Sequence, residues 1–366
     1  MKFSLSIVAL GVSLAFGAGS AMAASSADTT QTGNNQISNV TQRDNTMGSA
    51  TIKQSNKNNQ SQIIQQLNTS ATANVTQKGQ GTAPNDNNSY VEQKRNDKAL
   101  ATIKQDGKFY KSIVVQADNR DATAKVDQKG DTNRSEIYQT AGWTQLATVK
   151  QGAFSADNYA EIKQGAYHNE AHVDQGLGAN NVAKIDQTGN SADFANRSQR
   201  GYNLANVSQF GFDNDSNVKQ TGAWNEASST QYGLNNNSKI TQNRDSGAST
   251  NDWNEAYVTQ ASGFFGGPNY STVTQNGDNL YAEVGQIGGD LVSVVTQVGV
   301  GHDAILSQAG YNNSSDIKQT GSYNTANVTQ VGTGLVSLSD QSGFGHNNVV
   351  NQSGSNNTSN VIQSGS

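Results

Sequence analysis

A glutamine recurs along most of this chain at intervals of eleven or twelve residues, from Gln42 to Gln363. Taken two at a time, these intervals give a period within the range of about 20 to 50 residues that is typical of stacked supersecondary units. In such an array each unit contacts only its neighbours. The spacing therefore restricts the chain to a repeat fold.

The residues around each glutamine alternate with a period of two. A small residue lies four positions before the glutamine and an aliphatic residue usually lies two before it, as in Ala101-x-Ile103-x-Gln105. This pattern predicts a strand with one buried face, while Thr102 and Lys104 face water. Glycine commonly follows the glutamine by two, and asparagine often precedes the next glutamine by six. The expected unit is strand, Gly-x-x-Asn turn, strand.

The small residue distinguishes two kinds of strand, because it alternates between serine and alanine from Ser38 to Ala147. One serine strand and one alanine strand form a rung of about 23 residues. The sequence therefore predicts an all-β fold, a β-solenoid of about 14 two-strand rungs with amyloid-like cross-β stacking.

The alternation lapses from Ala160 and resumes at Ser216 with its phase reversed. The interval from Gln199 to Gln209 is the shortest between successive glutamines of the series, at 10 residues. Arg197 occupies an inward aliphatic position there, which indicates a local bulge or register fault. We expect two sub-arrays joined at this point, at about residues 38–199 and 205–366.

The two prolines of the chain test this register, because proline cannot donate to a strand ladder. Pro84 lies in the 16-residue interval after Gln77, and Pro268 lies in the 15-residue interval after Gln260. Both intervals are predicted loop excursions, and the longest interval, of 18 residues, is a third. None of the three has the features of a domain boundary, so we expect one continuous array over residues 38–366.

The composition is polar for a folded chain, with 33% apolar and 7% aromatic residues. Such a composition alone is typical of disorder. The strict period argues against disorder, because stacking places each inward amide over its copy in the next rung, where the amides can bond along the stack. The predicted assembly ladder consists of Gln42, Gln54, Gln65, Gln77, Gln105, Gln128, Gln220, Gln231, Gln308, Gln319, Gln330, Gln352, Gln363, Asn214, Asn225, Asn236, Asn313, Asn324 and Asn357.

The N-terminus predicts export. A basic residue, an apolar stretch over residues 3–18 and a small-residue cleavage motif indicate a signal peptide at 1–23, followed by a short lead-in at 24–37. No later segment is apolar enough to span a membrane. The chain has no cysteine, so no disulfide stabilises it. A net charge of −5 gives no reason to expect nucleic acid as a partner.

Outward charges also follow the stack. In alternate strands the residue just before the glutamine is Lys53, Thr76, Lys104, Asp127, Lys150 and Asp174. One interpretation is that neighbouring rungs set opposite charges side by side, and the other is a merely solvated face. Both discourage sideways association of the sheets.

Candidate sites for chemistry are scarce. His168 and His172 have a helical spacing but lie in a strand-and-turn context, so we interpret them as surface histidines. Asp213, Asp215 and Asp252 occur without the recurring calcium nonapeptide of β-rolls. All four histidines are expected in turns or on outer faces. We therefore predict no catalytic residue, no metal site and no cofactor, and do not expect an enzyme.

Aromatic residues gather in the predicted arcs between strands. They include Trp143, Trp224, Trp253, Tyr167, Tyr202 and Tyr323. We favour packing of the turns over the alternative of a contact surface for other molecules. Ice binding would suit flat threonine ladders, but only Thr272 and Thr274 place two outward threonines in one strand.

One unit summarises the repeat. From Gln319 to Gln330 the sequence has the form Gln-x-Gly-x-x-Asn-x-Ala-x-Val-x-Gln, which closely resembles the curlin repeat of curli subunits, and the resemblance covers nearly all of the expected mature chain. It implies a bacterial surface amyloid whose β-solenoid subunits polymerise into extracellular fibres of the biofilm matrix. It also implies as partners the chain itself, a nucleator subunit and outer-membrane export machinery. Compared with familiar curlins, the repeat number is expanded and a Gly-rich export segment is missing.

The sequence shows no end cap, and solenoids that stay monomeric need caps over their terminal strands. We therefore expect head-to-tail growth of a cross-β fibre, each subunit adding roughly 65 to 70 Å at about 4.8 Å per rung. The expected function is that of a structural subunit of extracellular curli-like amyloid fibres. The alternatives are a nucleator subunit and a secreted β-solenoid adhesin that does not polymerise.

Overall fold

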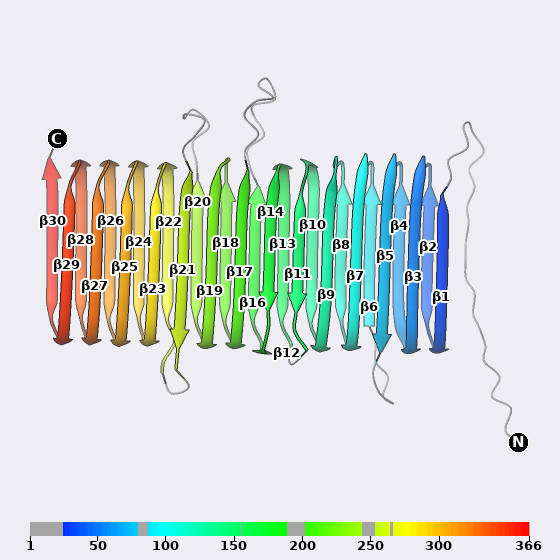
Figure 1. Ribbon diagram of the computed structural model, residues 1–366, viewed down its shortest axis with the longest axis horizontal. Coiled ribbons are helices and arrows are strands. Elements are labelled where there is room, and N and C mark those ends of the chain that lie inside the picture. Colours follow the sequence, from blue (N-terminus) through cyan, green and yellow to red (C-terminus); the bar gives the residue numbers. More distant parts are fainter. Residues whose placement is uncertain are drawn as a thin grey trace, which may run out of the picture. The chain divides into compact units, whose positions relative to one another are not determined.

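The computed structural model describes residues 25–79, 87–153, 155–188, 202–243, 253–263 and 266–365. Within these ranges all regular structure is β-strand and no helix occurs. The chain divides into two compact units, Met1–Leu177 and Gly178–Ser366. Each unit is a β-solenoid of parallel strands, which confirms the predicted fold class (Figure 1).

The first unit winds back and forth between two sheets. One sheet has the order β1-β3-β5-β7-β9-β11-β14 and the other β2-β4-β6-β8-β10-β13, with the short β12 beside β9. Its strands are β1 (Ser26–Asn34), β2 (Ile37–Arg43), β3 (Met47–Lys57), β4 (Asn59–Gln66), β5 (Ser70–Gly79), β6 (Asn87–Lys94), β7 (Lys98–Lys108), β8 (Lys111–Ala117), β9 (Ala122–Asp131), β10 (Arg134–Trp143), β11 (Leu146–Gln151), β12 (Ser155–Ala156), β13 (Tyr159–Tyr167) and β14 (Asn169–Gln175).

The second unit repeats this arrangement. One of its sheets has the order β17-β19-β21-β23-β25-β27-β29 and the other β16-β18-β20-β22-β24-β26-β28-β30. Its strands are β15 (Gly178–Ala179), β16 (Val182–Thr188), β17 (Asn203–Phe212), β18 (Asp215–Thr221), β19 (Asn225–Leu234), β20 (Asn237–Asn243), β21 (Asn254–Ser262), β22 (Tyr270–Asp278), β23 (Tyr281–Gly289), β24 (Val292–Val300), β25 (Asp303–Tyr311), β26 (Ser314–Ser322), β27 (Thr325–Thr333), β28 (Val336–Phe344), β29 (Asn347–Ser355) and β30 (Thr358–Gly365).

The strands stack in register, so each residue lies over its equivalent one rung away. In the first unit Gln42 pairs with Gln65, 23 residues on, and in the second unit Gln286 pairs with Gln308, 22 residues on. Both rung lengths agree with the glutamine spacing. Because the side-chain period of a strand is two, this register holds the glutamines of the periodic series on the inner face.

The core of each unit is the narrow space between its two sheets. In β7 the side chains of Ala101, Ile103 and Gln105 are buried, while Thr102 is half-buried and Lys104 is exposed. Small, aliphatic and amide side chains therefore form three parallel inner rows. The alternation predicted from the sequence is confirmed.

Serine and alanine rows separate by sheet, and the described strands do not show the expected reversal of phase. In the second unit β16, with Ala183, pairs with the serine strand β18, and β17 pairs with the alanine strand β19. The described strands thus keep alternating between sheet types after the alanine strand β14. The expected reversal depends on a strand at Gln199, and both Gln199 and Arg197 lie outside the described residues.

Two further expectations concern the loops that contain proline and the segment before the repeats. Pro268 lies between β21 and β22, outside any strand, whereas Pro84 and residues 244–252 fall outside the described residues. The segment 24–37, expected to be a lead-in, contains strand β1 and the beginning of β2.

Candidate assembly interface

The inward glutamines form continuous hydrogen-bonded ladders in both units. The side-chain Nε2 of each donates to Oε1 of the glutamine in the next rung, over 2.8 Å from Gln308 to Gln330 and 3.0 Å from Gln105 to Gln128. The ladders connect Gln31, Gln54, Gln77, Gln105, Gln128, Gln151 and Gln175; Gln42, Gln65, Gln93, Gln116, Gln139 and Gln164; Gln187, Gln220, Gln242, Gln275, Gln297, Gln319, Gln341 and Gln363; and Gln209, Gln231, Gln260, Gln286, Gln308, Gln330 and Gln352.

Each glutamine also ties the two sheets of its unit together. Nε2 of Gln308 in β25 donates to the backbone carbonyl of Val292 in β24, over 3.0 Å. Nε2 of Gln116 in β8 donates to the carbonyl of Leu100 in β7, over 3.2 Å. A buried primary amide is tolerable when its donors and its acceptor are all bonded. One glutamine per strand therefore joins neighbouring rungs and facing sheets at once.

The ladders have a direction. In every pair of these ladders the amide nitrogen of the lower-numbered glutamine donates and the oxygen of the higher-numbered one accepts, as in Gln42 to Gln65 and Gln341 to Gln363. Each ladder therefore presents oxygen toward its first rung and N–H toward its last.

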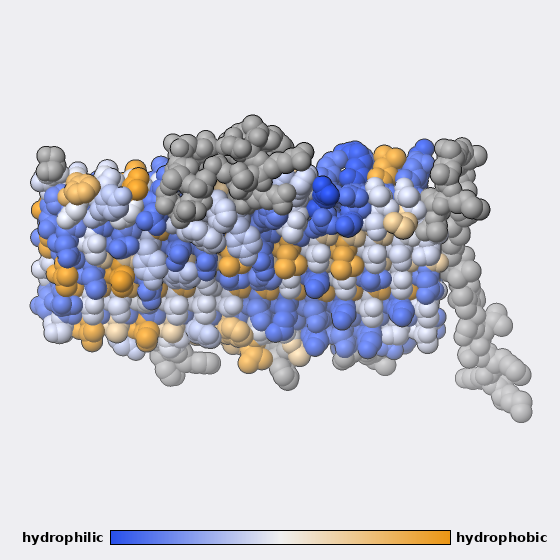
Figure 2. All heavy atoms as spheres, turned by 45° about the horizontal axis from the view of Figure 1, so that its top comes forward, coloured by the Kyte–Doolittle hydropathy of each residue, from blue (hydrophilic) through white to orange (hydrophobic). Residues whose placement is uncertain are grey.

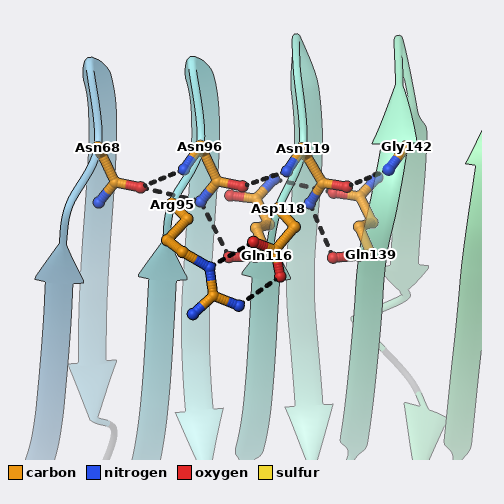
Figure 3. Close-up of polar contacts among 8 residues, drawn as sticks. All are labelled: Asn68, Arg95, Asn96, Gln116, Asp118, Asn119, Gln139 and Gly142. Carbon is orange, nitrogen blue, oxygen red and sulfur yellow. Dashed lines mark hydrogen bonds and ion pairs between the residues drawn. The ribbon is translucent and has the colours of Figure 1, made fainter.

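A second amide ladder, which the sequence analysis missed, runs along one arc of the first unit (Figure 3). The residues are Asn45, Asn68, Asn96 and Asn119. Oδ1 of each accepts the backbone N–H of the next, at 3.0 Å, 2.9 Å and 3.0 Å, and Gly142 N–H ends the row on Asn119. Each of these asparagines follows a ladder glutamine by three, within a twelve-residue interval.

Ion pairs lie over this arc, one residue before the asparagines. The guanidinium of Arg95 donates Nε and Nη2 to the two carboxylate oxygens of Asp118, over 2.5 and 2.6 Å. This hydrogen bonding lowers the pKa of Asp118 below its usual range. Both side chains are largely exposed, so the pair adds little stability.

The asparagines predicted from the sequence lie in arcs of the second unit. Asn214 and Asn236 stack through Oδ1 of Asn214, which accepts the backbone N–H of Asn236 over 3.1 Å. Oδ1 of Asn313 accepts the backbone N–H of Leu335 in the same way, over 3.0 Å. The other predicted members, Asn225, Asn324 and Asn357, hold equivalent positions, each with Nδ2 bonded to a carbonyl four residues earlier.

His302 lies in the arc between β24 and β25, as the expectation for the four histidines allows, but it does not lie at the surface. It is completely buried in the asparagine row, one rung before Asn324. Its Nδ1 accepts the backbone N–H of Asn324 over 3.2 Å, and its Nε2 lies 3.1 Å from the carbonyl of Val298. Burial lowers the pKa of His302 below its usual value. The neutral ring therefore substitutes for an asparagine amide.

In rungs where a glycine follows the glutamine by two, stacking usually requires that glycine. Gly321 has a φ of 108°, and a Cβ on it would lie well inside 3.0 Å of the carbonyl oxygen of Gly343 in the next rung. The left-handed turn residue comes two positions later, at Tyr323 with a φ of 56°. The glycine thus permits close approach of two backbones, while a non-glycine residue makes the turn.

The outward charged residues just before the glutamines lie in register from rung to rung. The interpretation that neighbouring rungs set opposite charges side by side requires this register. Lys104 pairs with Asp127, Asp127 with Lys150, and Lys150 with Asp174. The ammonium of Lys150 lies 3.1 Å from the carboxylate of Asp174. Figure 2 shows polar side chains with separate apolar ones among them on the visible face.

The arc aromatics pack against one another between rungs. Ring centroids are 5.6 Å apart for Trp143 and Tyr167, and 5.2 Å apart for Trp224 and Trp253. Tyr202 also contacts Trp253, with centroids 6.4 Å apart. Such distances are typical of favourable aromatic pairs. The packing interpretation is confirmed for these rings.

The residues considered for metal binding do not converge. His172 faces outward on β14 and its Nε2 lies 2.7 Å from Glu170, while His168 lies in the preceding turn. Over the described ranges no group of three or more His, Cys, Asp or Glu side chains could hold a metal ion. In the same ranges no helix is long and apolar enough to cross a membrane.

The first and last described strands pair on one side only. Within the described residues β1 pairs with β3 and β2 with β4, while β29 pairs with β27 and β30 with β28. Oε1 of Gln42 is shielded from solvent yet has no hydrogen-bond partner. Nε2 of Gln352 and of Gln363 donate only to the carbonyls of Val336 and Asn347.

Three segments of the chain match the family model of the curlin associated repeat. They are residues 156–189, 213–243 and 302–332, which include strands such as β14, β19 and β26. No curated protein matches the chain.

Proposed function

We propose that this chain, three segments of which match the curlin associated repeat, is a structural subunit of extracellular, curli-like amyloid fibres on a bacterial surface. In this role it supports adhesion and the biofilm matrix. The signal peptide expected at residues 1–23 directs it out of the cell. Its main partner is a further copy of itself, with a nucleator subunit and outer-membrane export machinery as further partners.

The observation that carries the proposal is the unfinished hydrogen bonding of the outermost strands. Strands β1 and β2 at one extreme, and β29 and β30 at the other, each leave one backbone edge without a partner among the described residues. Open parallel edges recruit strands from other chains. An identical chain fits these edges best, because its inward rows are the same.

Growth would follow the physics that stabilises each unit. An added copy supplies a new rung, which pairs its backbone with the exposed edge and its inward amides with the ladder glutamines. Every junction converts unpaired polar groups into paired ones, and an unpaired buried amide is costly. The ladder glutamines therefore determine both stability and assembly in this proposal.

The direct test is polymerisation of the purified chain beginning at Ala24. We expect fibres that bind an amyloid dye and sediment, with a lag phase that preformed fibres abolish. Preparations that stay monomeric at high concentration after seeding would remove the proposal and favour the non-polymerising adhesin. If the chain instead shortens the lag of a different subunit without elongating itself, it acts as a nucleator.

A further inference from the structure

Two tyrosine rings, Tyr257 in β21 and Tyr281 in β23, pack against each other on the outer face of a sheet of the second unit. Their ring centroids are 6.1 Å apart, with an angle of 51° between the ring planes. The strands pair so that Tyr257 lies beside Glu283, and Glu255 lies beside Tyr281. The two tyrosines are therefore diagonal neighbours, a relation in which aromatic side chains reach each other. Both residues are half-buried, so part of each side chain stays open to solvent.

Each phenol donates its hydrogen to a carboxylate on its own strand. The hydroxyl of Tyr281 lies 2.8 Å from Oε2 of Glu283, and that of Tyr257 lies 3.3 Å from Oε2 of Glu255. Burial and, after it, the bond to Glu283 raise the pKa of Tyr281 to about 12, so this phenol is protonated at neutral pH. A phenol that loses an electron becomes a strong acid, and a hydrogen-bonded carboxylate is placed to take its proton. The arrangement therefore favours loss of an electron and a proton together.

The composition directs oxidation of this unit toward its aromatic rings. Cysteine and methionine sulfur atoms are common targets of oxidation. The chain has no cysteine, and from Ala24 onward its one methionine is Met47, in the first unit. The second unit, Gly178–Ser366, has neither residue, so tyrosine and tryptophan are its main oxidisable side chains.

We propose that Tyr257 and Tyr281 are a modification site, at which hydrogen peroxide and a haem peroxidase join the two rings as dityrosine. The peroxidase takes one electron from each phenol, and the phenol protons pass to Glu255 and Glu283. The two tyrosyl radicals then couple through one ring carbon ortho to each hydroxyl. Each joined carbon loses its hydrogen as a proton, and each oxygen regains a proton from its glutamate. Overall, two tyrosines and one hydrogen peroxide give one dityrosine and two waters.

The paired strands make this coupling intramolecular. They hold the two side chains as neighbours in every folded chain, which favours coupling within the chain over coupling between chains in dilute solution. Rotation about the side-chain torsions closes the remaining distance, because both rings lie on the outer face and not in the core. The link encloses the segment that contains β22 and Pro268. It forms within one chain, so the inference goes beyond the proposed function and does not depend on fibre growth.

Peroxidase treatment of the dilute chain beginning at Ala24 tests the site. The chain is incubated with a haem peroxidase and hydrogen peroxide, dityrosine is measured by its fluorescence, and the link is located by mass spectrometry of digested peptides. We expect a single chain that has lost two hydrogen atoms and yields linked peptides containing Tyr257 and Tyr281. Links that map to other tyrosines, or that form only between chains, would overturn the proposal.

Phenylalanine variants test the two rings separately. Tyr257→Phe and Tyr281→Phe keep the ring and remove the hydroxyl that is oxidised, and each should lower the dityrosine yield about fivefold or more. The matched control is Tyr270→Phe, on β22 in the other sheet, because Tyr270 is more exposed, at 48%. If reactivity followed exposure alone, Tyr270→Phe would lower the yield most, and that result would contradict the site. Matched unfolding midpoints of the three variants are the folding control.

Glu283→Gln tests the carboxylate as proton acceptor. The variant keeps an oxygen that accepts the hydrogen bond of Tyr281, but an amide is a far weaker base than a carboxylate. We expect the initial rate of dityrosine formation to fall about threefold, with the same final yield because the rings still pack. An unchanged initial rate would contradict this role. A final yield that falls with the rate would show instead that Glu283 only holds the ring in place.

Discussion

At the scale of single residues, glutamine suits the inner face because its amide carries two N–H groups and one carbonyl. In Gln308 the amide nitrogen bonds Gln330 and the Val292 carbonyl, and its oxygen accepts from Gln286. Gln308→Ala leaves three buried partners unpaired, at about 1 to 3 kcal/mol each. We expect the free energy of unfolding to fall by about 3 kcal/mol or more in urea denaturation of the monomer. The exposed neighbour Ser307→Ala should change it by less than about 0.5 kcal/mol.

Glycine offers a paired test at the same scale. Gly321→Ala would force a methyl group against the carbonyl of Gly343, while Gly285→Ala meets nothing within 4 Å. We expect Gly321→Ala to lower stability by at least about 2 kcal/mol, from strain and overpacking. Gly285→Ala should be neutral or stabilise by up to about 1 kcal/mol. Equal effects in thermal unfolding would contradict the close-stacking role of the glycine row.

The burial of His302 predicts that the free energy of unfolding depends on pH. Burial lowers the pKa of His302 in the folded chain, so between pH 7 and 5 the unfolded chain binds a proton that the folded chain resists. Stability is then full above about pH 6.5, the ordinary histidine pKa, and decreases as the pH falls below it. His302→Asn restores the amide found at Asn324 and should flatten the dependence. An unchanged pH slope in the variant would show that another group is responsible.

At the scale of strands and arcs, most strands could be predicted directly from the sequence. A small, an aliphatic and an amide side chain at alternate positions specify one face, and stacked copies specify the register. The first strand was missed because Ala27-x-Thr29-x-Gln31 has threonine where an aliphatic residue is usual. The expected change of phase depends on counting Gln199 as a ladder position, and Gln199 lies outside the described residues.

The arcs were predicted less completely than the strands. The asparagine six residues before a glutamine was recognised, but the row through Asn68 and Asn96 follows its glutamine by three. Burial of His302 was also missed, because a ring in an arc is buried by the rungs above and below it. Sequence spacing within one repeat does not contain that information.

The asparagine row predicts that the arcs contribute to stability. Asn96 donates Nδ2 to Asn68 and to the Gln116 carbonyl, and its Oδ1 accepts the N–H of Asn119. Asn96→Ala should lower the free energy of unfolding by about 2 to 3 kcal/mol. The matched control is Asn327→Ala on the exposed face of β27, expected within about 0.5 kcal/mol. Hydrogen exchange should quicken at Asn119 in the first variant alone.

At the scale of the whole molecule, polar rows replace a large apolar core. Each rung is stabilised mainly by its two neighbours, so the outermost rungs are the least satisfied part of the described chain. The same contacts that stack rungs within a unit can stack rungs between copies. In this account, folding and fibre growth are one kind of reaction.

Fibre diffraction from aligned fibres of the chain beginning at Ala24 tests this claim most directly. Stacking that continues from copy to copy predicts a reflection near 4.8 Å on the meridian, because the strands then lie across the fibre axis. Fibres with that reflection on the equator, or with none, would contradict the account, since the rungs would then not follow the axis of growth.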